Sequence, residues 1–97
     1  SVNKLENKQA SLMAKSREAI LTWQQTLEQI QLYTRTVSDY GDLLSAERVM
    51  FDAGESSLFM VNAREVGYIN SQITLIKLEK QLRKADLQIE YSLGRLQ

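Results

Sequence analysis

The sequence predicts an all-α protein, a long antiparallel helical hairpin with coiled-coil packing. Its 97 residues contain no proline, the residue that breaks helix interiors. Apolar residues recur at steps of three, four and seven, which is coiled-coil spacing. One cluster of turn-forming residues, Gly54-Glu55-Ser56-Ser57, separates two long patterned segments. We therefore expect one hairpin over residues 1–97, with a helix over about 2–52, a tip over 53–57 and a helix over about 57–95.

The first predicted helix carries an apolar seam along one side. The seam consists of Ile20, Trp23, Leu27, Ile30, Val37 and Leu44, and Thr34 fills one further position. Gly41 lies inside this pattern, where a glycine costs about 1 kcal/mol of helix propensity. It marks a slight bend or is simply tolerated, and we favour the second interpretation.

The second predicted helix carries two apolar stripes. The first recurs every seven residues at Val61, Tyr68, Leu75, Leu82, Ile89 and Leu96, joined by Leu78 and Ala85. The second consists of Val66, Ile69, Ile73 and Ile76. At about 100° per residue the stripes point about 150° apart, so one packs on the first helix and the other needs a second neighbour. Because two helices alone form a small core, we expect self-association or a larger parent protein; an ordinary antiparallel bundle is the alternative.

The predicted tip combines turn signals with apolar residues. Gly54 can adopt the left-handed conformation that closes a helix, and Ser56 or Ser57 can cap the next one. The next four residues, 58–61, are consecutive and apolar. A helix cannot direct four consecutive side chains at one neighbour, so at least one faces something other than the first helix. Exposed apolar residues at a tip indicate a docking surface.

The composition argues against several classes of function. The chain has no His and no Cys, and its 12 basic and 12 acidic residues give a net charge of zero. It thus lacks the commonest general base, the commonest metal ligands and a basic excess for nucleic acid. We expect no enzyme activity, no catalytic residue, no cofactor, no metal and no nucleic-acid partner. The abrupt start at Ser1 suggests a piece of a longer protein.

The residues around the tip resemble the C-terminal repeat of TolC-like outer membrane efflux proteins. The resemblance is carried by Ala46-Glu47-Arg48, by the run from Phe51 to Leu58, by Val61-Asn62-Ala63-Arg64-Glu65 and by the closing Ser92-Leu93-Gly94-Arg95-Leu96. The family pattern has a Gly-x-Ser tip followed by a long helix that ends in Leu-Gly. The match covers about residues 46–96, and residues 1–45 match only as a long helix.

The resemblance implies a periplasmic location within an outer membrane protein. Members of the family are trimers whose hairpins form a periplasmic α-barrel, and the hairpin tips meet a periplasmic adaptor (membrane fusion) protein that links to an inner membrane pump. The chain would be one α-barrel segment of such an efflux duct within a tripartite transport system. Adaptor docking carries over to Gly54, Ser56, Ser57 and Leu58, with Glu55 among them by position. For the isolated segment, a dimer is an alternative to the parent's trimer.

The sequence also departs from the family pattern at the entrance of the duct. Ala63 stands where the family often has an Asp that forms an acidic ring. Arg64 and Glu65 could form other gating links, although solvated surface charges are the favoured interpretation of both. A generic coiled-coil interaction or scaffold module is the alternative function, and it gives the Gly-Glu-Ser-Ser tip no special role.

Overall fold

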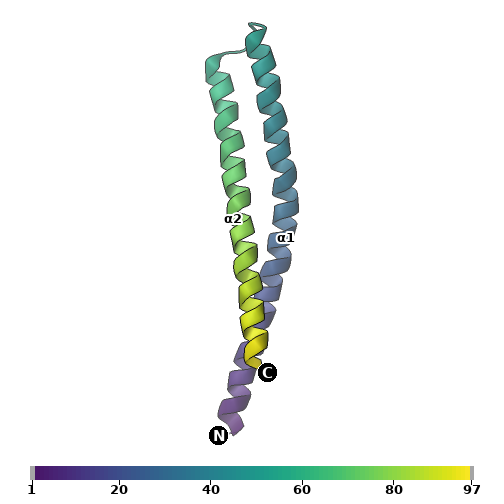
Figure 1. The fold of residues 1–97 in the computed structure, drawn as a ribbon, viewed down its shortest axis with the longest axis vertical. Coiled ribbons are helices and arrows are strands. Elements are labelled where there is room, and N and C mark those ends of the chain that lie inside the picture. The colour runs from purple at the N-terminus through teal and green to yellow at the C-terminus, as the bar shows by residue number, and fades with distance from the viewer. Residues whose placement is uncertain (1, 97) are drawn as a thin grey trace. The chain divides into compact units, whose positions relative to one another are not determined.

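The computed structural model describes residues 2–96, and it consists of two helices (Figure 1). Helix α1 comprises Val2–Asp52, and helix α2 comprises Leu58–Leu96. Both are α-helical throughout, and no strand occurs among the described residues. The predicted all-α helical hairpin is therefore confirmed. The chain divides into two compact units, which we call the tip unit, Gln29–Leu78, and the terminal unit, which combines the residues up to Glu28 with those from Glu79.

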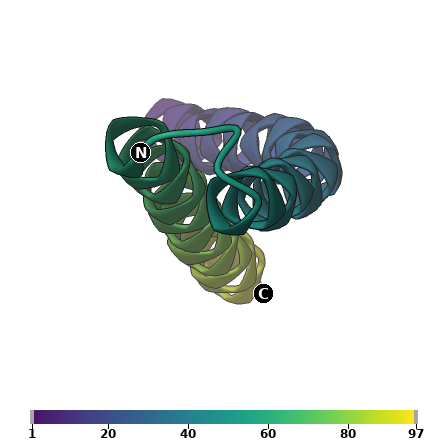
Figure 2. The same ribbon diagram turned by 90° about the horizontal axis from the view of Figure 1, so that it is seen from above.

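In the tip unit the two helices lie side by side and antiparallel, joined by the turn that crosses between them (Figures 1 and 2). Its buried side chains are Leu44, Glu47, Val61 and Ser71. Further seam residues at seven-residue steps, such as Val37 on α1 and Tyr68 on α2, are half-buried. The seven-residue stripe predicted for the second helix therefore faces α1.

Two glycines of the tip unit accept tyrosine rings from the opposite helix. A Cβ on Gly41 would lie 3.3 Å from the Tyr68 ring, and a Cβ on Gly67 would lie 3.1 Å from the Tyr40 ring. The missing side chains thus leave room for two reciprocal ring contacts. Gly41 is therefore a packing position for the Tyr68 ring, a role that the sequence interpretation did not include.

In the terminal unit the buried side chains are small. They are Ser16, Ala19 and Thr26 on α1, and Ala85 and Ser92 on α2. Thr26 is fully buried, and its Oγ1 accepts a hydrogen bond from Gln81 Nε2 at 2.8 Å. Small seam residues permit close approach of two helices. The N-terminal end of α1, whose residues 2–11 are all exposed, extends past the end of α2 (Figure 1).

Two details of the predicted seam are wrong. Ile20 is exposed, whereas its neighbour Ala19 is buried. Thr34 is also exposed, and its hydroxyl donates to the Ile30 carbonyl of its own helix at 2.7 Å. The half-buried residue beside it is Tyr33, seven positions after Thr26. The structure does not describe the side chain of Leu96, the last residue of the predicted stripe.

Candidate functional site: the hairpin tip

The turn at the tip begins with a glycine-closed helix end. Gly54 has a φ of +77°, the left-handed conformation that glycine adopts without strain. Its N–H donates to the Phe51 carbonyl at 3.0 Å, and the Glu55 N–H donates to the Met50 carbonyl at 2.8 Å. This pair of bonds is a Schellman motif, which satisfies the last carbonyls of α1. The predicted left-handed, helix-closing conformation of Gly54 is confirmed.

The start of α2 is capped by the second serine of the tip. Ser57 Oγ accepts a hydrogen bond from the Met60 N–H at 3.2 Å, three residues further along the chain. This is the N-cap geometry, which satisfies one of the free N–H groups of a first helical turn. Of the two predicted capping residues, Ser57 therefore caps α2, and Ser56 is free to make a different contact.

That contact joins Ser56 to a buried carboxylate of α1. Ser56 Oγ donates to Glu47 Oε2 at 2.6 Å, and Arg64 Nε donates to Glu47 Oε1 at 3.2 Å. Only 8% of the Glu47 side chain is exposed. The hydrogen bond from Ser56 is the main cause that lowers the pKa of Glu47 below its ordinary value of 4.5; the hydrogen bond and charge of Arg64 act in the same direction, and burial opposes them. The carboxylate thus contacts the turn and α2 at once.

A second ion pair lies one residue further along each helix. Arg48 Nη2 contacts Glu65 Oε1 at 2.8 Å, and both side chains are well exposed. Arg64 and Glu65, the two candidate gating residues, are therefore each paired with a residue of α1, while both side chains stay more than a third exposed. Gating and solvated surface charge both stay predictions for them. Glu47, the partner of Arg64, was missed as a site residue, because a charge within a long helix usually marks a solvated face.

Apolar side chains surround the turn and are exposed. Six exposed side chains, which together we call the tip patch, lie at the two helix ends next to the turn: Val49, Met50 and Phe51 on α1, and Leu58, Phe59 and Met60 on α2. Phe59 is 78% exposed, whereas Val61 is buried. Of the four consecutive apolar residues at the start of α2, three are thus left uncovered. Asp52 and Glu55, between the two triplets in the sequence, are exposed as well.

The second predicted stripe of α2 is exposed in the tip unit. Val66, Ile69, Ile73 and Ile76 each have about half of their surface uncovered. Four aliphatic side chains on one helix face form a larger apolar surface than isolated exposed residues do. The expectation that α1 alone would not cover this face is therefore correct.

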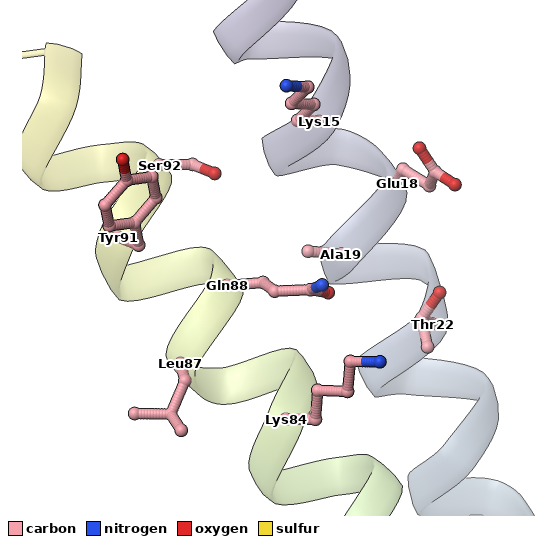
Figure 3. Close-up of a pocket in the computed structure, with 9 residues that line it drawn as sticks. All are labelled: Lys15, Glu18, Ala19, Thr22, Lys84, Leu87, Gln88, Tyr91 and Ser92. Atoms are coloured by element: carbon pink, nitrogen blue, oxygen red, sulfur yellow. The ribbon is translucent and has the colours of Figure 1, made fainter.

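The terminal unit contains a groove between its two helical segments (Figure 3). It has a volume of about 550 Å³ and is open to solvent. Two of its lining residues, Ala19 and Ser92, have small side chains and leave space between the helices. Lys84 and Gln88 extend from α2 toward α1, whereas Leu87 points away from α1 (Figure 3). Charged and amide side chains from Lys15, Glu18, Lys84 and Gln88 line it together with the small residues.

Comparison with known proteins adds no assignment. No family model, no curated protein and no solved structure matches the chain. Within residues 2–96, neither helix has a stretch that is both apolar and long enough to cross a membrane. The resemblance to TolC-like proteins therefore rests on the sequence alone, chiefly on residues 46–65 and 92–96.

Proposed function

We propose that the chain is a periplasmic α-barrel segment of an outer membrane export duct, and that its tip docks a periplasmic adaptor protein. The observation that carries the proposal is the tip patch. Six apolar side chains are exposed on both sides of a turn whose backbone is fixed by a Schellman motif and a serine cap. A fixed, exposed apolar surface is what a partner protein requires, since ordering a flexible one would weaken binding.

The sequence resemblance supports the same partner. The residues that carry it include Gly54, Ser56, Ser57 and Leu58, and all four lie in or beside this turn. In TolC-like proteins the corresponding tip meets the adaptor, which links the duct to an inner membrane pump. Gly54 and Ser57 would act by shaping the backbone of the tip, and Leu58 by direct apolar contact.

The exposed face of α2 supports assembly with further helices. In an α-barrel each helix contacts neighbours on both sides, and Val66, Ile69, Ile73 and Ile76 would meet such a neighbour. A trimer in the parent protein places sister helices on this face. The isolated segment would cover the same face by forming a dimer.

The proposal is tested by site-specific photo-crosslinking in the full-length parent protein in cells. The probe replaces Leu58 in the tip patch, and the control probe replaces Lys84 in the terminal unit. We expect a crosslink to a periplasmic adaptor from Leu58 and none from Lys84. Crosslinks from Leu58 to sister chains alone, or to nothing, would favour a generic coiled-coil scaffold instead.

A further inference from the structure

The tip patch has two halves that belong to different helices. The first part of the turn is bonded to α1 and the last part to α2. The N–H groups of Ala53, Gly54 and Glu55 all donate to carbonyls of α1, at distances from 2.8 to 3.1 Å. Ser57, in contrast, caps α2. Hydrogen bonds therefore attach residues 53–55 to the α1 half of the patch and Ser57 to the α2 half.

Glu47 bridges these two parts. Its Oε2 accepts from Ser56 at 2.6 Å, in the turn, and its Oε1 accepts from Arg64 at 3.2 Å, on α2. The carboxylate itself belongs to α1, two residues before Val49. One buried side chain thus joins α1, the turn and α2. One half of the tip patch begins two residues after Glu47, and the other half ends four residues before Arg64.

We propose that Glu47 is the positioning residue of the docking tip: it fixes the two apolar triplets relative to each other and so sets the affinity of the tip for its adaptor. This inference rests on the proposed docking function. Glu47 itself, being buried, makes no contact with the adaptor. It acts by keeping the triplets in the binding arrangement before the partner arrives, which reduces the ordering cost of association.

The neighbouring Arg48–Glu65 pair is a natural control. It also joins α1 to α2, at 2.8 Å, but its side chains are 56% and 39% exposed. Exposed ion pairs contribute little because water and salt screen them. Removing Arg48 should therefore leave the tip unchanged, although the variant loses the same number of interhelical ion pairs as one that loses Glu47.

The first test measures the tip geometry of the 97-residue chain alone. Because the chain has no cysteine, spin labels can be attached at V49C and F59C, one in each triplet. We expect a narrow distance distribution in the otherwise unchanged chain and in R48A, and a broad one in E47A. S56A and R64Q should each broaden the distance distribution less than E47A does, because each removes only one of the two bonds to Glu47. E47Q should also broaden the distribution less than E47A does, because it keeps an acceptor for Ser56. Helix content measured by circular dichroism identifies any variant that simply unfolds.

The second test measures docking in the full-length parent with the Leu58 probe. We expect E47A to lower the yield of adaptor crosslink by about fivefold, at the lower end of typical coupling between sites, and E47Q to restore part of it. R48A should crosslink as the unmodified protein does. Adding S56A to E47A should cause no further loss, since both substitutions remove the same bond.

The outcomes separate this inference from the function on which it rests. An E47A chain with an unchanged, narrow distance distribution overturns the positioning role, and so does an E47A parent that crosslinks at full yield. A parent with native Glu47 that gives no adaptor crosslink overturns the docking function, even where the distance measurement behaves as expected, and removes the docking role of Glu47 with it.

Discussion

The tip unit and the terminal unit use the same two helices but hold them together with different contacts. The terminal unit buries small side chains, such as Ala19 and Ala85, which need no particular shape in the opposite helix. The tip unit buries Leu44 and Val61, pairs two tyrosine rings with two glycines, and closes with the Glu47 contacts. Small side chains tolerate several alignments of two helices, whereas these larger and polar contacts fit only one.

The tip unit is the more strictly specified part of the fold. Within the terminal unit, the Thr26–Gln81 hydrogen bond is a polar contact that distinguishes one alignment from another, as single polar seam residues do in coiled coils. In the tip unit the specific contacts lie in and near the end that we propose to be functional. Four changes test this difference, and they are ordered by expected effect.

The largest effect is expected from L44A in the tip unit. Leu44 is 5% exposed, and truncating a buried leucine costs about 2–5 kcal/mol. Leu43, the adjacent residue, is 43% exposed, so L43A is the matched control and should change stability by less than about 0.5 kcal/mol. Thermal unfolding by circular dichroism, at one protein concentration for both variants, measures the difference. Equal melting temperatures would contradict the assigned seam.

A smaller effect is expected from G54A at the tip. The left-handed backbone there costs a residue with a Cβ about 1–2 kcal/mol, although no atom would obstruct the new methyl group. Gly94 also has open space around it, but its backbone is helical. G94A should therefore stabilise α2 slightly, by at most about 1 kcal/mol. We expect G54A to lower and G94A to raise the melting temperature. Shifts of the same sign would mean that the space around each glycine, and not its backbone conformation, determines the effect on stability.

T26V should have a comparable or smaller effect in the terminal unit. The substitution keeps the shape of the fully buried Thr26 and removes the acceptor for Gln81. Because Gln81 is exposed and can turn to water, we expect a loss of about 0.5–1.5 kcal/mol. Q81A in the same background should add little further loss. An additive loss would show that Thr26 and Gln81 act independently.

The smallest effect is expected from protonation of Glu47. Its pKa is lowered in the folded chain, chiefly by the bond from Ser56, so ionised Glu47 stabilises the fold above its ordinary pKa of 4.5. This stabilisation is lost as the pH falls through the lowered folded value. The melting temperature of the unmodified chain should drop more than that of E47Q over this range. Parallel plots of melting temperature against pH for the two proteins would mean that Ser56 and Arg64 do not stabilise the ionised form of Glu47.

The sequence allows much of the fold to be predicted because the signals are local. Helix ends at about residues 52 and 58 follow from Gly54 and the two serines, and the seven-residue stripe of α2 follows from its periodicity. The burial of Ser16 and Thr26 could not be foreseen, since patterns are read from large apolar residues and small polar ones carry no such signal.

The candidate site was only partly predictable. The turn residues and the exposure of Leu58 follow from adjacent residues. The role of Glu47 depends on partners nine and seventeen positions away, and these meet only when the hairpin has formed. Gly67 was overlooked for the same reason: the Tyr40 ring that needs its missing side chain belongs to the other helix.

The measurement that tests the docking tip most directly is hydrogen exchange in the full-length parent, with and without its adaptor. A partner that covers the tip patch slows exchange of the backbone amides at residues 49–51 and 58–60. We expect protection to appear at both triplets, while residues 79–96 of the terminal unit keep their rates. Unchanged exchange at the tip, together with adaptor-dependent protection elsewhere on the hairpin, would contradict the proposal that the tip is the docking surface.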